Sequence, residues 1–207
     1  MGWWRQERHG PDYMGRLYAM ERALNTDEIK PVIVMGGGAA GITAAIAAAR
    51  QGAKVTLLER EKIEYSEFPA DFLKSSGDSL MDELDRLRVE IISKCKVVEI
   101  VREKEHYWTV VTAMGDLWIE FKADALVMAV GTGEGYMHND GAGLFFLKKL
   151  GVPPLPADIY LAGELLKPEG PEGWDCVIKL QWALTTGYIA GKSAADAAKR
   201  KRQAGYD

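Results

Sequence analysis

The stretch PVIVMGGGAAGITAAIAAARQGAKVTLLER, residues 31–60, decides the fold. It opens with a short apolar run at 32–35, turns through glycines, and continues as an alanine-rich run at 39–51 that ends before Gly52. A second apolar run follows at 55–59. Continuous apolar runs are typical of parallel strands covered on both faces, and glycine often ends a helix. The stretch therefore predicts a strand, a helix and a second, parallel strand.

The glycine turn has the pattern G-x-G-x-x-G in residues 36–41. In this context Gly36 permits a tight turn, Gly38 lets the backbone approach a pyrophosphate, and Gly41 lets the helix pack closely on the sheet. Ala39 and Ala40 supply the first free N–H groups of the helix, whose positive end attracts phosphate. We expect these five residues to bind the pyrophosphate of a dinucleotide.

An acidic residue ends the second predicted strand, where the ribose of a bound dinucleotide would lie. The carboxylate of Glu59 can accept hydrogen bonds from both ribose hydroxyls and would repel a 2′-phosphate. Glu59 and the adjacent Arg60 are therefore candidate cofactor-binding residues, for NAD or FAD in preference to NADP. The fingerprint alone does not separate NAD from FAD, because both contain the ADP group that it binds.

The C-terminal third favours FAD. The run YLAGE, residues 160–164, is an apolar strand that ends in Gly163 and Glu164, which suits a backbone approach to a ribityl chain whose hydroxyls the carboxylate binds. A helix predicted over 179–200 offers an N-terminus and the cation of Lys179, either of which stabilises the negative charge of a reduced flavin. A solvent-exposed role for Glu164 and Lys179 is the alternative.

The remaining pattern predicts a single α/β domain with a Rossmann-like parallel sheet and a β-meander. Residues 1–30 are expected to be an N-terminal arm containing a helix at 12–25, and residues 31–207 the nucleotide-binding domain. Further helices are expected at 78–88, capped by Asp78, and at 141–150. Strands are expected at 89–92, 96–102, 106–112 and 117–121, which together form the meander at about 89–121, and at 125–130 and 159–162.

Composition excludes several classes of function. The 207 residues carry a net charge of −4, which argues against nucleic acid or anionic lipid as partners, and the KRKR run at 199–202 is expected to cap the last helix. Two distant cysteines give no disulfide or zinc spacing, the histidines suggest no metal site, and no signal peptide is evident. The uncharged run at 31–49 holds four glycines and is interpreted as strand, turn and helix, not as a membrane span. We expect a cytoplasmic protein.

These motifs, in this order, resemble the FAD-binding parts of the BaiN-like (YhiN-type) NAD(P)/FAD-dependent oxidoreductases. The resemblance covers most of residues 31–195 and also rests on Ala129-Val130-Gly131 and on the run LQWALTTGYIAG at 180–191. It implies a flavin-binding Rossmann domain in which Val97 contacts adenine through its backbone. It further implies cofactor-binding roles for Ala129, Gly131, Gln181 and Trp182.

The chain departs from that family where a large substrate domain is normally inserted, since only the proline-containing stretch 151–158 precedes the predicted strand at 159. We therefore expect a minimal FAD-binding flavoprotein, a low-specificity oxidoreductase or electron-transfer protein with NAD(P)H as a possible electron donor and no identifiable catalytic residue. The alternative is a non-catalytic FAD- or NAD-binding or assembly module. Because the flavin edge would lack its usual cover, a homo-oligomer is expected, with the aromatic arm as the covering element.

Overall fold

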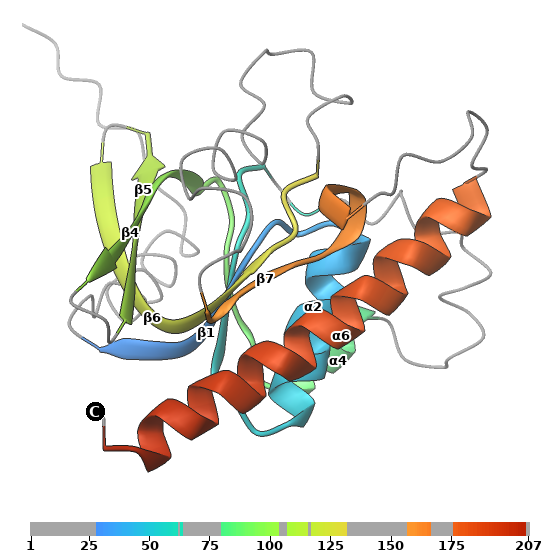
Figure 1. The fold of residues 1–207 in the computed structure, drawn as a ribbon. Coiled ribbons are helices and arrows are strands. Elements are labelled where there is room, and N and C mark those ends of the chain that lie inside the picture. Colours follow the sequence, from blue (N-terminus) through green and yellow to red (C-terminus); the bar gives the residue numbers. More distant parts are fainter. Residues whose placement is uncertain are drawn as a thin grey trace, which may run out of the picture.

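The computed structural model describes residues 28–61, 63, 80–103, 107–115, 117–131, 157–166 and 176–205. The expected arm helix, the Asp78 cap and the helix at 141–150 lie outside these residues. Within them, the chain forms one seven-stranded sheet, whose parallel part has helices on one face and the meander strands toward the other (Figure 1).

The parallel part of the sheet is built on the strand–helix–strand unit. Strand β1 (Ile29–Met35) lies between β2 (Val55–Leu58) and β6 (Leu117–Met128), and helix α2 (Ala39–Arg50) connects β1 to β2. Strand β3 (Glu90–Ile92) extends the sheet beyond β2, and β7 (Ile159–Leu161) pairs with β6. All these pairings are parallel, as the apolar runs predict.

Two expectations about the strands are wrong. Strand β3, which was grouped with the meander, pairs parallel to β2, so the meander consists of β4 (Lys96–Glu103), β5 (Tyr107–Met114) and the first part of β6. The strands expected at 117–121 and 125–130 are one continuous strand, β6. The polar Lys122 and Asp124 suggested a break, but Asp124 is buried and ion-paired within the strand.

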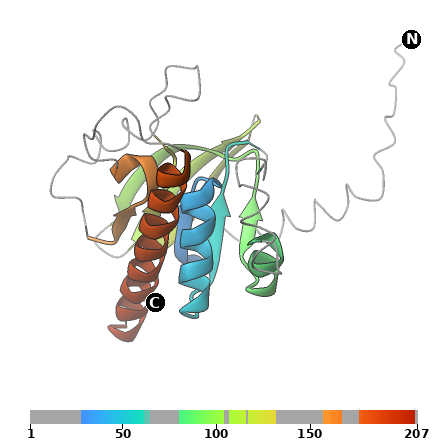
Figure 2. The same ribbon diagram turned by 90° about the vertical axis from the view of Figure 1, so that its right-hand side faces the viewer.

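Three helices cover one face of the sheet, side by side in Figure 2. These are α2, α4 (Leu80–Arg86) and α6 (Cys176–Gln203), and α6 begins three residues before the expected start at 179. Alternation along the strands divides the core: Val32 and Val34 face the helices, whereas Ile33 and Met35 face the meander, where Trp108 and Phe121 are buried. No helix among the described residues is long and apolar enough to span a membrane.

Ion pairs connect the helices to each other and to the sheet. Glu83 of α4, which is almost fully buried, pairs with Arg50 of α2 and with Arg86. Burial acts to raise the pKa of the Glu83 carboxyl, but hydrogen bonds from the two arginines and their charges outweigh it, and the net pKa is lowered. Glu83 is therefore held in its charged form between α2 and α4.

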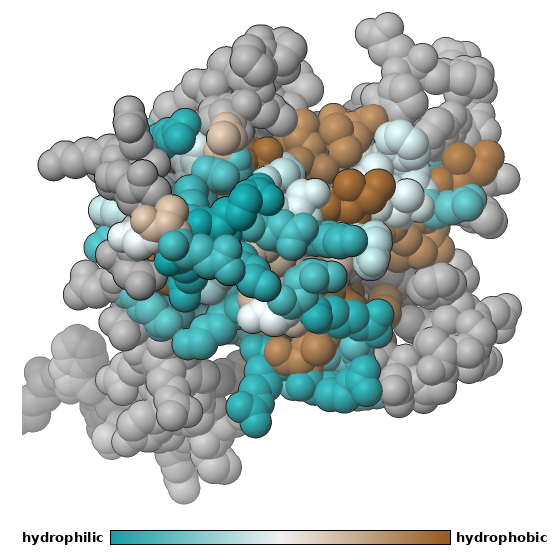
Figure 3. All heavy atoms as spheres, turned by 60° about the horizontal axis from the view of Figure 1, so that its bottom comes forward, coloured by the Kyte–Doolittle hydropathy of each residue, from teal (hydrophilic) through white to brown (hydrophobic). Residues whose placement is uncertain are grey.

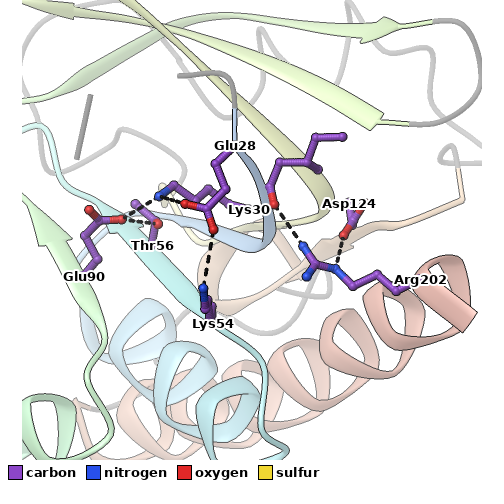
Figure 4. A network of polar contacts seen from close by, with 8 residues as sticks. Glu28, Lys30, Lys54, Thr56, Glu90, Asp124 and Arg202 are labelled. Atoms are coloured by element: carbon purple, nitrogen blue, oxygen red, sulfur yellow. Dashed lines mark hydrogen bonds and ion pairs between the residues drawn. The ribbon is translucent and has the colours of Figure 1, made fainter. Parts of the chain in front are cut away.

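A polar network lies at the N-terminal edge of the parallel sheet, the end opposite the glycine turn (Figure 4). There Lys30 Nζ lies 3.4 Å from Glu28 and 3.6 Å from Glu90, whose carboxylate also accepts a hydrogen bond from the Thr56 hydroxyl. The Lys30 charge is the main cause that lowers the pKa of Glu28.

The expected arm overlaps the sheet, because its last two residues, 29 and 30, belong to β1.

The basic run at the end of α6 contacts the sheet and the segment before β7. Arg202 Nε lies 3.0 Å from Asp124 Oδ2, and its guanidinium also donates to the carbonyl oxygen of Ile29 at 2.9 Å. Lys201 donates to the carbonyl oxygen of Asp124 and pairs with Asp158 at 2.9 Å. These two side chains dock α6 onto β1, β6 and the segment before β7, which the sequence reading did not predict.

Candidate functional site

The glycine turn connects the carboxyl end of β1 to the start of α2. Gly36 has a φ of +105°, and a Cβ at this position would lie 2.4 Å from the carbonyl oxygen of Ala129. At Gly41 a Cβ would lie 1.7 Å from the carbonyl oxygen of Gly36. Each glycine is thus required by a backbone that passes too close for a side chain. The turn is pressed between the end of β6 and the first turn of α2.

Gly38 is different, because a Cβ there would have no atom within 4 Å among the described residues, its two chain neighbours aside. It is the N-cap residue of α2, and neither a capping side chain nor an acidic residue in the first turn compensates the positive end of this helix. The open space at Gly38 therefore adjoins the free N–H groups of Ala39 and Ala40. This arrangement fits a pyrophosphate, and it shows that the residues present can accommodate a dinucleotide.

Glu59 lies beside the turn, directly after β2. Its carboxylate accepts hydrogen bonds from the backbone N–H of Gly37 and, at 2.8 Å, from the N–H of Glu61. The half-buried Glu59 side chain is thus held against the loop that would carry the pyrophosphate. The guanidinium of the adjacent Arg60 lies 3.7 Å from the carboxylate of Glu61, so the two side chains form an ion pair within residues 59–61.

The backbone of Glu59 connects to the start of β4. Cys95 N donates to the Glu59 carbonyl oxygen at 2.9 Å, two residues before Val97, where the β4–β5 register shifts. Val97 thus follows, by two residues, a backbone contact with Glu59. Burial raises the pKa of the Cys95 thiol, and a hydrogen bond with Thr112 opposes this effect.

The C-terminal motif reaches the same turn from the other side. Gly163 opens a short 3-10 helix, η2 (Gly163–Leu166), and a Cβ on it would lie 3.0 Å from the Cβ of Ala40. A Cβ on Gly131 would lie 3.5 Å from the Glu164 carboxylate. Gly163, Glu164, Ala40 and Gly131 therefore form one cluster, although they come from three separate parts of the sequence.

The predicted residues on α6 have different surroundings. The indole N–H of Trp182 donates to the carbonyl oxygen of Gly163 at 3.2 Å, so Trp182 contacts the motif at 160–164. Lys179 and Gln181 are exposed. Lys179 was expected to begin α6 but lies about one turn after its first residue. It lies on the same helix face as Thr186, which is seven residues later.

Thr186 is not among the predicted site residues, although it lies in the run at 180–191 on which the resemblance rests. This buried threonine accepts a hydrogen bond from the backbone N–H of Gly163 at 2.9 Å. The sequence could have indicated a site role for Thr186, because it lies four residues after Trp182 and residues so spaced share a helix face. Within the described residues, no group of three or more potential metal ligands occurs.

The comparisons with known proteins identify the family. The pyridine nucleotide-disulphide oxidoreductase family matches residues 8–144, about two thirds of the chain. The chain belongs to this family. The match begins within the segment expected to be an arm and includes the glycine turn, Glu59 and Gly131. Proteins of this family bind FAD and act in redox reactions with pyridine nucleotides, which confirms the expected FAD cofactor and the Rossmann-like fold.

Several solved structures are similar to part of this chain. They include p-nitrophenol 4-monooxygenase from Pseudomonas putida (18% identity, TM-score 0.43, 50% of this chain and 41% of that chain) and bacillithiol disulfide reductase from Bacillus cereus (18%, 0.42, 50% and 40%). Thioredoxin reductase from Lactococcus lactis is 26% identical, with a TM-score of 0.39 over 49% of this chain and 35% of that chain. The chain thus spans less than half the length of these proteins, and no curated protein matches it.

Proposed function

We propose that this chain is a minimal FAD-binding flavoprotein that acts as a low-specificity oxidoreductase or electron-transfer protein. The observation that carries the proposal is the open space at Gly38, next to a glycine turn otherwise packed against Ala129 and Glu59. In this proposal the turn binds the pyrophosphate, Glu59 the adenosine ribose, and Val97 lies near adenine. The Gly163–Glu164 turn holds the ribityl chain.

The bound flavin would supply the electron-accepting group, and NAD(P)H is the proposed donor. The chain's own residues bind and orient that flavin through the N-terminus of α2 and through Gly131 and Glu164. Orientation of a specific substrate provides much of an enzyme's rate advantage. Because only residues 151–158 stand where the BaiN-like proteins insert a substrate domain, we expect slow transfer to small acceptors such as quinones, dyes or oxygen.

The BaiN-like subtype and a single FAD-binding domain over 31–207 are part of the same proposal. Contacts between the C-terminal motif and the glycine turn support a single domain, since Gly163 meets Ala40 and Gly187 packs on the Ala40 carbonyl. A cytoplasmic location is also proposed. Cys95, which is a free thiol buried on the meander face, is compatible with a reducing compartment.

The visible spectrum of the purified protein is the first test. A yellow protein that releases FAD on heating, identified by mass, supports the proposal, whereas release of NAD alone or failure to bind added FAD in an absorbance titration contradicts it. Anaerobic mixing with NADH, NADPH and dithionite then tests the redox role. Bound flavin that none of these reduces would instead favour a non-catalytic FAD-binding or assembly module, for which the short 151–158 segment is the supporting observation.

We also propose that the protein is a homo-oligomer. Ile178, Tyr188 and Ile189 of α6 are exposed by 44%, 51% and 58%. Figure 3 shows hydrophobic residues gathered toward the side on which the first half of α6 lies. Sedimentation of wild type and of the Ile189→Glu variant tests this surface, and deletion of residues 1–27, which retains Glu28, tests the arm. A monomeric wild type would refute the homo-oligomer.

A further inference from the structure

Both backbone polar groups of Gly163 bind side chains of α6. Its N–H donates to Thr186 Oγ1 at 2.9 Å, and its carbonyl oxygen accepts from Trp182 Nε1 at 3.2 Å. Trp182 and Thr186 are four residues apart and so lie on one face of α6. We refer to Gly163, Trp182 and Thr186 as the clasp. It fixes, at two points, the turn in which the C-terminal motif at 160–164 ends.

The Thr186 hydroxyl is oriented to accept the Gly163 N–H. Its own hydrogen is directed to the carbonyl oxygen of Trp182 at 2.7 Å, with that of Ala183 at 3.3 Å, so a lone pair remains for Gly163. Thr186 is only 8% exposed, and its branched Cβ restricts its rotamers in a helix. The hydroxyl is therefore held in one place, and water does not easily replace it.

The clasp acts on the point where both halves of the candidate site meet. Gly163 has a φ of +71°, a left-handed conformation suited to glycine, and its Cα side faces Ala40 in the first turn of α2. Gly187, next to Thr186, packs against the carbonyl group of Ala40. The Glu164 carboxylate, one residue after Gly163, lies beside Gly131. A shift of the clasp would therefore move the Glu164 carboxylate relative to the pyrophosphate turn.

We infer that Thr186 is a positioning residue for the cofactor, which sets the Gly163–Glu164 turn against the N-terminus of α2 and thereby fixes how the flavin end of FAD is held. Loss of the hydroxyl leaves the buried N–H of Gly163 without its acceptor, a costly arrangement that a displaced turn relieves. This inference deepens the proposed function and rests on it. Thr186 acts through Gly163 and Glu164, and Trp182 supports the same turn from its other side.

Three variants test the inference. Thr186→Val keeps the shape and removes the hydroxyl, Thr186→Ser keeps the hydroxyl, and Thr56→Val is the matched control. Thr56 is also a buried threonine whose hydroxyl is hydrogen-bonded, but its partner is Glu90 in the network at the opposite edge of the sheet. The measurements are the FAD dissociation constant by absorbance titration, the position of the bound-flavin bands, and the thermal unfolding of the apoprotein.

The expected result is that Thr186→Val weakens FAD binding by about tenfold or more and shifts the flavin bands, while Thr186→Ser stays within about threefold of wild type. Thr56→Val should destabilise the apoprotein yet bind FAD within about threefold of wild type. If Thr186→Val does not fold, Thr186→Ala, which favours the helix, replaces it with the same expectation.

Three results overturn the inference alone. The first is wild-type affinity and spectrum in the variants without a hydroxyl at 186, and the second is binding by Thr186→Ser as weak as theirs. A loss of FAD affinity in Thr56→Val equal to that in Thr186→Val overturns it as well, because the effect would then be one of general stability. A wild-type protein that binds no FAD overturns the proposed function and, with it, this inference.

Discussion

Substitution of Gly38 by alanine separates the fold from the binding of the cofactor. Gly38 has φ −74° and ψ −177°, which alanine adopts freely, and among the described residues other than its chain neighbours no atom lies within 4 Å of the added methyl group. Loss of glycine lowers the entropy of the unfolded chain and stabilises by about 0.4–1 kcal/mol, whereas alanine is a poorer N-cap by a similar amount. The apoprotein should therefore unfold within about 0.5 kcal/mol of wild type.

The bound form should behave differently, because the methyl group would occupy the space into which a pyrophosphate fits. At an FAD concentration of one hundred times the dissociation constant, ligand binding stabilises wild type by about 2.7 kcal/mol. A tenfold weaker variant at the same concentration gains only about 1.4 kcal/mol. At about 2–4 °C per kcal/mol for a chain of this size, the FAD-induced rise in Tm should fall to about half.

Thermal unfolding with and without FAD measures both effects in one experiment. Gly36→Ala is the matched control, because its positive φ and the Ala129 carbonyl at 2.4 Å should destabilise the apoprotein itself. An unchanged FAD-induced rise in Gly38→Ala would refute the assignment of this space to the pyrophosphate. A large loss of apoprotein stability in Gly38→Ala would refute the claim that the space is open.

Three further predictions concern charges. Lys179→Met should lower the two-electron reduction potential of bound flavin by about 20–60 mV in a spectroelectrochemical titration. Equal potentials in wild type and variant would mean that the Lys179 charge points into solvent and does not act on the flavin. The lowered pKa of Glu83 contributes stability that is present above pH 4.5 and is lost as pH falls through the lower folded-state value. Between about pH 5 and pH 3 the urea midpoint should therefore fall less steeply in Glu83→Gln than in wild type. Parallel curves for the two proteins would contradict this. Arg202→Ala removes the ion pair of buried Asp124 and should cost about 2 kcal/mol in urea unfolding, less than a fully buried pair because Arg202 is 42% exposed, whereas Lys199→Ala should cost little.

The errors in the sequence reading have specific physical causes. Lys122 and Asp124 interrupt an apolar run, which argued for two strands, but β6 passes through them because α6 supplies the Arg202 counter-charge 78 residues away. Strand β3 is short and follows a helix, so its sequence does not reveal whether it pairs with β2 or with β4. Such pairing depends on long-range contacts that no local pattern contains.

The sequence by itself determined the strand–helix–strand unit, the glycine turn and the acid after β2, because these residues are close in the chain and their spacing carries the geometry. Family membership and the FAD cofactor agree with that local reading. Only the tertiary structure decided that Trp182 and Thr186 of α6 form hydrogen bonds with Gly163. It also decided that Gly163 contacts Ala40, which precedes it by more than 120 positions in the sequence. Side-chain contacts between remote segments depend on how the helices pack on the sheet, and the linear pattern does not specify that packing.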